Sequence, residues 1–208
     1  MSNIIVQKFG GTSVGSVERI DAVADIIKNA SLSEKIVVVV SAMSGETNKL
    51  VSLAKHFGDN PDKREFDALV STGETISSAL LTMALHSKGV KARSFSATQI
   101  SMKTTSTYSK AKILDVDSNK IMSVIENDTI PIITGFQGVT ETGDITTLGR
   151  GGSDTTAVAI AAQIKAKRCD IYTDVDGIYT TDPKIVSNAK KLDSITMEEM
   201  LELAGQGA

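Results

Sequence analysis

The sequence predicts an α/β fold, a three-layer α/β/α sandwich built around a central, mostly parallel sheet. Continuous apolar runs such as residues 36–40 are typical of strands that are buried on both faces, as in a parallel sheet covered by helices. These runs alternate with segments of helical periodicity, and glycine-rich loops follow several of them. A chain of 208 residues suits one such domain, so we expect a single domain over residues 1–208.

Composition excludes several classes of function. The net charge is −3 with no run of Lys or Arg, so neither a nucleic acid nor an anionic membrane is an expected partner. No apolar run is long enough to span a membrane and the start lacks a signal-peptide pattern, so we expect a cytoplasmic protein. Cys169 is the only cysteine and we expect it to be a small buried residue rather than a nucleophile. With two histidines, a Ser-His-Asp or Cys-His hydrolase is disfavoured.

The first unit is a strand, a glycine loop and a helix. Residues 3–9 are strand-like, residues 10–16 are glycine-rich, and the apolar residues that follow recur at helical spacing. Gly10 and Gly15 have the spacing of a Walker loop, but the Lys-Ser/Thr pair that the loop requires is missing. A charged Lys8 at the end of an apolar strand is costly unless it meets an anion, which favours a phosphate partner.

The second unit places hydroxyl groups at a strand end. Residues 35–43 form the most apolar predicted strand, and a loop and a helix follow it. Ligands of open parallel sheets sit at the carboxyl ends of the strands, where Ser41 and Thr47 are expected. Either hydroxyl could equally cap the helix.

A long helical segment over residues 65–88 is expected to be interrupted around residues 71–75, where Gly73 lies. Glu74 would then begin the second part of the helix. Its carboxylate could simply be favoured there by the helix dipole, or it could accept a hydrogen bond from an ammonium group.

The middle of the chain continues the alternation. We expect a strand, a mobile hydroxyl-rich surface loop, a helix, a strand that runs into a loop with two glycines, and a hairpin turn, at residues 91–96, 104–109, 117–127, 130–138 and 141–144. The parallel strands and intervening helices predict right-handed crossovers.

The strongest site signal is the glycine-rich octet at residues 149–156, which runs into a helix. Ser153 or Asp154 can cap this helix, and the N–H groups at such a helix start attract anions. Arg150 adds a planar cationic fork suited to a carboxylate or phosphate. Asp154 adds an oxygen ligand that could face a metal or orient another group.

The last part of the chain holds a strand followed by a long polar loop. Residues 169–173 are strand-like, and the polar groups of residues 173–184 suit a nucleotide's base and ribose, although a loop without a ligand would look the same. A capping box at residues 196–199 predicts a final short helix.

Together these motifs resemble those of aspartate kinase, in the amino acid kinase superfamily. They occur in the family's order over nearly the whole chain, at residues 8–14, 40–43, 71–74, 135–138, 148–156 and 172–177. The resemblance implies the amino acid kinase fold, with ATP and Mg²⁺ as cofactors and L-aspartate as substrate. It implies transfer of the γ-phosphoryl group to the β-carboxylate, which gives 4-phospho-L-aspartate, the first step toward lysine, threonine and methionine.

The resemblance also implies roles for individual residues. Lys8 and Asp154 would be catalytic, with Lys8 on the phosphates and Asp154 orienting Lys8 or the metal-bound phosphates. Arg150 would clamp the α-carboxylate of aspartate and Glu74 its ammonium group, with hydrogen bonds from Thr47 and Ser153. The nucleotide contacts would be Lys8, Phe9, Gly10, Gly11, Ser41, Thr173, Asp174, Tyr179, Asp182 and Lys184. Lys184 stands where the family often has Arg, and no residue is assigned as a direct metal ligand.

The resemblance further implies that the domain lacks its last elements and the paired ACT domains of the family. We therefore expect a homo-oligomer or association with a regulatory part. One alternative is another kinase of the superfamily, acting on glutamate, N-acetylglutamate, carbamate or UMP. A free amino acid is favoured because Glu74 and Arg150 match an ammonium and a carboxylate. The other alternative is a non-catalytic nucleotide-binding subunit.

Overall fold

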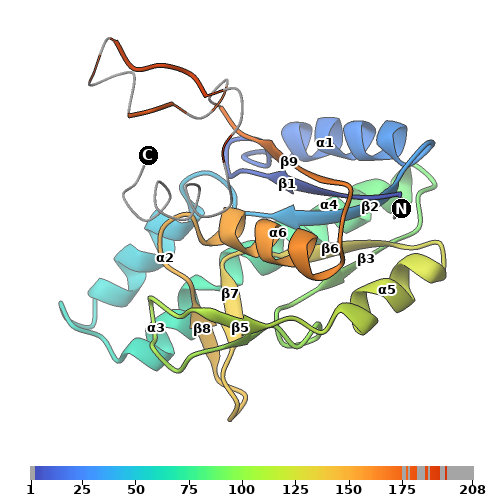
Figure 1. Cartoon of the computed structure of the whole chain (residues 1–208). Helices are drawn as coiled ribbons and strands as arrows, with labels where there is room; N and C mark the ends of the chain where they lie inside the picture. Colours follow the sequence, from blue (N-terminus) through green and yellow to red (C-terminus); the bar gives the residue numbers. More distant parts are fainter. Residues whose placement is uncertain are drawn as a thin grey trace.

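The computed structural model describes residues 3–174, 177, 179–181, 186, 188–192 and 195. Within them, a five-stranded sheet with the order β3-β6-β2-β1-β9 forms the centre, and all of its strand pairs are parallel (Figure 1). The strands are β1 (Ile4–Phe9), β2 (Lys35–Val40), β3 (Ala92–Phe95), β6 (Ile130–Thr134) and β9 (Arg168–Tyr172). The predicted parallel sheet is confirmed. Asp182, Lys184 and the helix predicted after Thr196 lie outside the described residues.

Helices cover both faces of this sheet, which gives the predicted three layers (Figure 1). On one face, α1 (Val17–Ala30) and α4 (Thr72–Ser87) share a buried core with alternate residues of β1 such as Ile5 and Phe9. On the other face, α5 (Ser118–Glu126) and α6 (Gly152–Gln163) share a second core with Val6 and its neighbours. Since side chains alternate along a strand, Lys8 points to the α6 face.

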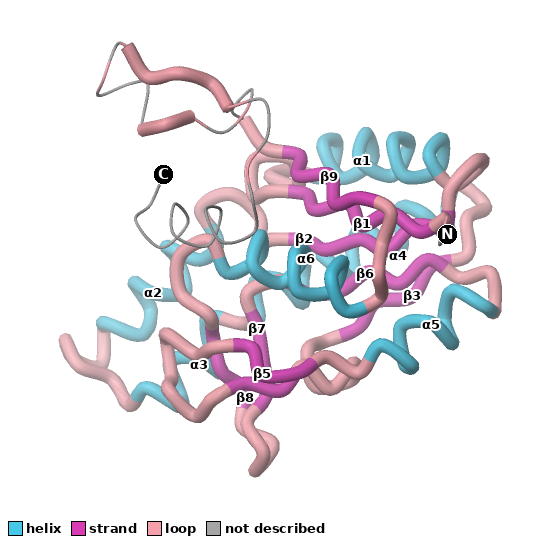
Figure 2. The backbone as a smooth tube through the Cα atoms, viewed as in Figure 1, coloured by secondary structure: helices cyan, strands magenta, loops and turns pink. Residues whose placement is uncertain are grey.

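A second, mixed sheet lies below the first, with the order β5-β4-β7-β8 (Figure 2). Its strands are β4 (Lys103–Thr104), β5 (Ile113–Asp115), β7 (Gln137–Val139) and β8 (Ile145–Thr147). The antiparallel β7–β8 pair confirms the predicted hairpin. The predicted surface loop at residues 104–109 begins one residue later, because Thr104 belongs to β4, is buried, and has its hydroxyl 2.6 Å from that of Thr146. Residues 105–109 do form a loop, in which Ser106 and Thr107 are exposed, and its mobility stays a prediction. Because Thr104 and Thr146 lie far apart in the sequence, no pattern among neighbouring residues predicts their contact.

The remaining helices, α2 (Glu46–Lys55) and α3 (Lys63–Val70), pack against each other beside the second sheet. The predicted interruption between α3 and α4 is confirmed but narrower, since only Ser71 separates the two. Helices α3 and α4 together cover Lys63–Ser87, which by length and composition alone could cross a membrane. The apolar window within this stretch has a mean hydropathy of 1.3. Half of that apolar window is buried inside the molecule, where α4 packs on α1 and β3.

The carboxyl ends of neighbouring strands are tied together by backbone hydrogen bonds. The N–H of Gly10 donates to the carbonyl of Tyr172 at 3.0 Å, and that of Ser41 donates to Phe9 at 3.1 Å. Likewise the N–H of Gly135 donates to the carbonyl of Val40 at 2.9 Å. The loops after β9, β1, β2 and β6 therefore leave the sheet side by side, and this edge is where ligands of open parallel sheets bind.

Candidate active site

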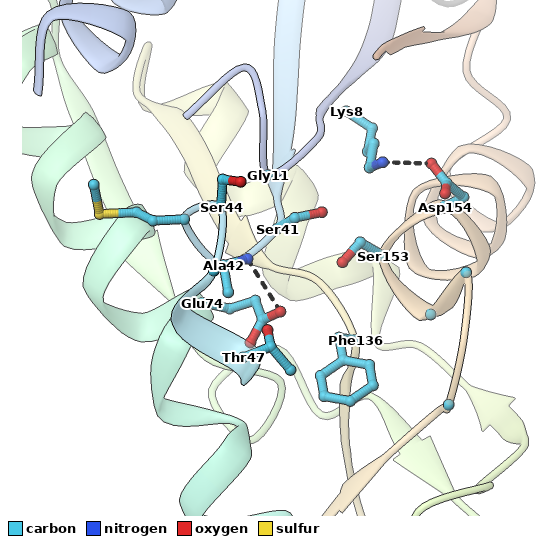
Figure 3. A pocket seen from close by; sticks show the side chains of 15 residues that line it. Lys8, Gly11, Ser41, Ala42, Ser44, Thr47, Glu74, Phe136, Ser153 and Asp154 are labelled. Carbon is cyan, nitrogen blue, oxygen red and sulfur yellow. Dashed lines mark hydrogen bonds and ion pairs between the residues drawn. The ribbon is translucent and has the colours of Figure 1, made fainter. Parts of the chain in front are cut away.

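A cavity of about 310 Å³ lies at this edge, a volume at the lower end of the range for small-molecule sites. Its walls come from the ends of β1 and β2, the starts of α2, α4 and α6, and the loop after β6 (Figure 3). The lining residues are Lys8, Gly11, Ser41, Ala42, Met43, Ser44, Gly45, Thr47, Glu74, Phe136, Gly149, Gly151, Gly152, Ser153 and Asp154. Six side chains predicted for the site are therefore brought together, those of Lys8, Ser41, Thr47, Glu74, Ser153 and Asp154.

One corner of the cavity holds an ion pair. The ammonium of Lys8 lies 2.7 Å from Asp154 Oδ1 (Figure 3). Lys8 is buried, whereas about a third of the Asp154 side chain is exposed. Asp154 stands in the first turn of α6, where the helix dipole favours a negative charge. The charge of Lys8 is thus balanced within the protein, at a point open to the cavity.

The start of α6 forms a second part of the wall. The expectation that Ser153 or Asp154 caps this helix was wrong, because the N-cap is Gly151 and no side chain caps it. Gly151 has a φ of 66°, a left-handed conformation that favours glycine, so the backbone itself begins the helix. Ser153 and Asp154 consequently lie inside the first turn and face the cavity, beside backbone N–H groups that have no intrahelical acceptor.

Close packing fixes this helix start against the loop after β6. A Cβ atom on Gly135 would lie 2.7 Å from Ser153 Oγ, and one on Gly152 would lie 2.8 Å from the ring of Phe136. Both distances are shorter than atoms tolerate, so only glycine fits at either position. The hydroxyl of Ser153 therefore has a defined place in the wall.

The opposite corner holds a buried carboxylate that forms no ion pair with any other described residue. Glu74 is 3% exposed, and its Oε1 accepts a hydrogen bond from the N–H of Ala42 at 3.1 Å (Figure 3). Its Oε2 has no hydrogen-bond partner among the described residues. Burial raises the pKa of Glu74 to about 7, although the N–H of Ala42 acts in the opposite direction. Such a group is poised to receive a cationic hydrogen-bond donor.

Hydroxyl groups occupy the space between the two corners. Ser41 and Ser153 project between the Lys8 corner and Glu74, and Thr47 lies beside Glu74 (Figure 3). Neither Ser41 nor Thr47 caps α2, because its N-cap is Gly45, at a φ of 83° and without a side-chain cap. Of the two readings that the sequence left open, the structure excludes helix capping for both hydroxyls.

Other residues predicted for the site do not line the cavity. Phe9 is fully buried in the core, and its ring stacks on that of Tyr172 with the ring centroids 4.5 Å apart. Gly10 is also buried. Arg150 is exposed, although its neighbours Gly149 and Gly151 do line the cavity.

The described residues among those predicted for the nucleotide near the end of β9 do not line the cavity. Thr173 and Asp174 are exposed directly after the strand, and the hydroxyl of Thr173 donates to Asp174 at 3.2 Å. Tyr179 is half-buried and forms an isolated antiparallel bridge with Lys191. Asp182 and Lys184 lie outside the described residues.

Phe136 is a cavity residue that sequence reasoning missed. It has a φ of 66°, which is unusual for a residue with a side chain. Its N–H donates to Thr156 Oγ1 at 3.2 Å and its carbonyl accepts from Leu148 at 3.0 Å, and these bonds hold the conformation. The available signal was the motif at residues 135–138, in which Gly135 directly precedes Phe136 and Gly138 follows two residues after it.

Cys169 is half-buried on the α6 face of β9, as a small packing residue is expected to be. Burial raises the pKa of its thiol to about 11, with a smaller contribution from Asp170. Little thiolate is therefore present at neutral pH, which agrees with the expectation that Cys169 is not a nucleophile.

Comparisons with known proteins agree with the resemblance that the motifs indicate. A family model described as "Amino acid kinase family" matches residues 3–208. Over 206 residues, 99% of this chain, the sequence is 55% identical to an aspartate kinase of Pseudomonas putida and covers 50% of that protein. The chain spans about half the length of the curated relatives it matches.

Solved structures give the same result. The aspartate kinase from Synechocystis matches with a TM-score of 0.78 and 47% identity, over 98% of this chain and 34% of that one. E. coli aspartokinase III in complex with aspartate and ADP matches with a TM-score of 0.85 and 31% identity, over 97% of this chain and 56% of that one. Since the family model also covers nearly the whole sequence, the chain belongs to the amino acid kinase family.

Proposed function

We propose that this domain catalyses ATP-dependent phosphorylation of the β-carboxylate of L-aspartate, which gives 4-phospho-L-aspartate, the first step toward lysine, threonine and methionine. The observation that carries the proposal is the pairing of two unlike corners in one cavity. An ammonium group and an oxygen of Glu74 that has no partner among the described residues stand at opposite ends of it. Support also comes from the similar proteins, which are named aspartate kinases.

The reaction needs no general base. A carboxylate with an ordinary pKa of about 4 is already ionised at neutral pH and can attack the γ-phosphorus directly. The protein's task is then to position two anions that repel each other and to stabilise charge on the transferring group. This task suits a cavity whose described lining contains no histidine.

The Lys8 corner suits the phosphates. The ammonium of Lys8 and the N–H groups at the start of α6 and in the loop at Gly10 and Gly11 would bind their oxygens. Asp154 would hold Lys8 in place until the nucleotide arrives and would then orient it. Ser41 would contribute a hydrogen bond from the middle of the cavity.

The Glu74 corner suits the free amino group of aspartate. The buried Oε2 of Glu74 would accept a charge-assisted hydrogen bond from that ammonium group. Thr47 and Ser153 would add hydrogen bonds to the substrate. Arg150 would clamp the α-carboxylate, which requires its exposed guanidinium to turn toward the glycines on either side of it.

Mg²⁺ would enter with the nucleotide. Among the described residues, no group of three or more His, Cys, Asp or Glu side chains could hold a metal ion by itself. One carboxylate together with the phosphates of a nucleotide is the usual Mg²⁺ environment in kinases, and Asp154 fits the role of that carboxylate. The ion would neutralise charge on the phosphates when bound.

The remaining parts of the proposal rest on the family resemblance. Thr173, Asp174, Tyr179, Asp182 and Lys184 would line the nucleotide site beyond β9. We also propose a homo-oligomer or a complex with a regulatory part, and a cytoplasmic location. Analytical ultracentrifugation and cell fractionation would test these two points.

Capture of the acyl phosphate tests the reaction. The purified chain, ATP and Mg²⁺ are incubated with hydroxylamine and with L-aspartate, L-glutamate or N-acetylglutamate in turn, and the hydroxamate is measured. We expect signal with L-aspartate alone. N-acetylglutamate has no ammonium group and would leave the Glu74 carboxylate buried without a partner. A folded protein that binds ATP but gives no hydroxamate with any acid would refute the proposal for this chain and would favour a non-catalytic nucleotide-binding role.

A further inference from the structure

Asp67, in α3, is a second buried carboxylate, and it does not line the cavity. It is 0% exposed, and within the described residues it forms no ion pair within 4.0 Å. Instead it accepts four hydrogen bonds from two residues. Oδ2 accepts from the backbone N–H groups of Ser109 and Thr147, each at 2.8 Å, and Oδ1 accepts from their hydroxyls at 2.9 and 3.0 Å. A buried carboxylate is stable only when so fully satisfied.

These four bonds hold the start of the glycine loop that lines the cavity. Thr147 ends β8, and Leu148 and Gly149 follow it directly. Ser109 approaches the same loop from the other side, because its carbonyl would lie 3.3 Å from a Cβ on Gly149. Ser109 itself has a φ of 65°, which is a strained value for serine and one that the bonds to Asp67 help to maintain. Asp67 therefore joins α3 to both sides of the loop.

The same helical stretch also carries Glu74. Asp67 and Glu74 are seven residues apart along Lys63–Ser87, which is about two turns of helix. The break between α3 and α4 is fixed as well, because the carbonyl of Ser71 accepts a hydrogen bond from the side chain of Gln137 in β7. Two consecutive helices joined at a fixed break thus present Glu74 to the cavity, from α4, and anchor the glycine loop that faces it, from α3.

We propose that Asp67 is a positioning residue, which holds the loop at Gly149–Gly151 at a fixed distance from Glu74. The inference rests on the proposed function and deepens it, since it concerns the amino-acid end of the cavity. The Lys8 corner does not depend on Asp67 in the same way. Asp154 lies on α6, which is anchored by its own core residues Ala157 and Ile160. Loss of Asp67 should therefore weaken aspartate binding more than nucleotide binding.

Two variants of Asp67 test this role by steady-state kinetics. In Asp67→Ala all four bonds are lost, and we expect the aspartate KM to rise about 10- to 30-fold with the ATP KM changed less than about twofold. In Asp67→Asn the amide oxygen can still accept from both N–H groups, and the two hydroxyls can turn to accept from the amide nitrogen. We expect this variant to stay within about threefold of the wild type.

The matched control is Asp62→Asn, which makes the same change of charge at the exposed N-cap of the same helix, where asparagine also caps well. Its aspartate KM should equal that of the wild type. A folded Asp67→Ala protein with an unchanged aspartate KM, or with both KM values raised equally, would overturn the inference. If Asp67→Ala does not fold, Thr147→Val removes one of the four bonds, and the expected rise in the aspartate KM is about threefold, with no rise being the contrary result.

Hydrogen exchange gives a readout that needs no catalysis. In Asp67→Ala the amides of residues 147–152 should exchange faster, those of β1 and β2 should not, and Asp67→Asn should restore the wild-type pattern. Exchange that rises equally throughout the protein would show a general loss of stability and would overturn the inference. If the wild type forms no hydroxamate from aspartate, the proposed function fails, and the exchange comparison still decides whether Asp67 fixes the loop.

Discussion

Asp154 and Glu74 are carboxylates in the first turns of two helices, and they face the same cavity from opposite ends. Asp154 is partly exposed and lies 2.7 Å from the ammonium of Lys8. Glu74 is 3% exposed, its Oε1 accepts from the N–H of Ala42, and its Oε2 has no hydrogen-bond partner among the described residues. Within the part of the chain that the structure describes, a residue of opposite charge pairs with Asp154 and none pairs with Glu74.

This difference matches the two ligands that the proposed reaction brings together. At the Lys8 corner, a salt bridge keeps a cation in place without leaving it unpaired in the core, and phosphates can then share that cation. At the Glu74 corner, where no described residue supplies the opposite charge, the proposed function assigns that charge to the ligand. A ligand with an ammonium group at one end and an anion at the other therefore satisfies both corners.

Removal of Lys8 should produce the largest effect. Among the described residues that line the cavity, Lys8 is the only cation, so Lys8→Ala leaves the transferring phosphoryl group without its main side-chain charge. We expect kcat to fall about 100- to 1000-fold, in the range measured for the loss of one group that stabilises transition-state charge. The hydroxamate assay at saturating aspartate and ATP measures the change, and circular dichroism shows whether the fold is retained. A tenfold change in kcat corresponds to about 1.4 kcal/mol of activation free energy. A kcat within threefold of the wild type would therefore contradict a role for Lys8 in the mechanism.

Glu74→Gln should affect the other corner alone. Glutamine keeps the size and the acceptor oxygen but loses the charge that an ammonium group would meet, so we expect the aspartate KM to rise about 10- to 100-fold. The ATP KM should stay unchanged, because the nucleotide binds at the Lys8 corner. Parallel titrations of the two substrates measure the split. A rise in the ATP KM of the same size would show that the two corners do not divide the ligands as proposed.

The same corner should make aspartate binding depend on pH. With a pKa of about 7, Glu74 is protonated in most molecules at pH 6, and the ammonium group must then compete with that proton. We expect the aspartate KM to fall about fivefold between pH 6 and pH 7, to reach a total fall of about tenfold by pH 8, and to level off there. The Glu74→Gln variant is the control, and its KM should be flat over this range. A wild-type profile as flat as that of the variant would contradict the role of Glu74.

Some features of the fold and the site could be predicted from the sequence and others could not. The difference depends on whether a feature leaves a pattern among neighbouring residues of the sequence. The central sheet was predicted correctly because strands such as β2 are continuous apolar runs bounded by loops. Lys8, Ser41 and Glu74 stood out because polar groups at strand or helix ends are conspicuous in an apolar context. Their convergence then followed from the rule that carboxyl ends of parallel strands share one edge.

Strands β4 and β5 of the second sheet, Phe136 and Asp67 had no comparable local signal. Strands β4 and β5 have two and three residues, too few for a period to be visible, and are held by distant partners. The conformation of Phe136 depends on hydrogen bonds to Thr156 and Leu148, which no pattern around it reveals. Asp67 occupies a helix position that would suit a surface carboxylate, and only the fold shows that Ser109 and Thr147 enclose it.

Substitutions of Glu74 and Asp154 should change the free energy of unfolding in opposite directions. The effect at Asp154 is the smallest expected here. Because burial raises the pKa of Glu74 from 4.5 to about 7, the free energy of unfolding of the unliganded protein should decrease as the pH rises through this interval. Below pH 4.5 Glu74 is protonated in both the folded and unfolded states, and above pH 7 the full cost of burying its charge is present. Glu74→Gln should therefore stabilise the protein at pH 8, by up to about 3 kcal/mol.

Asp154→Asn should act in the opposite direction and weakly. The substitution removes a charge from a partly exposed ion pair and from the start of α6, and the amide oxygen can still accept from Lys8, so the loss should be about 1 kcal/mol or less. Urea unfolding of both variants and of the wild type, at pH 5 and at pH 8 without ligands, measures the two effects together. If Asp154→Asn were the more stabilising of the two at pH 8, the ion pair would be the strained element of the cavity. In that case, the lack of a described cation beside Glu74 would no longer explain why the cavity needs a ligand with an ammonium group.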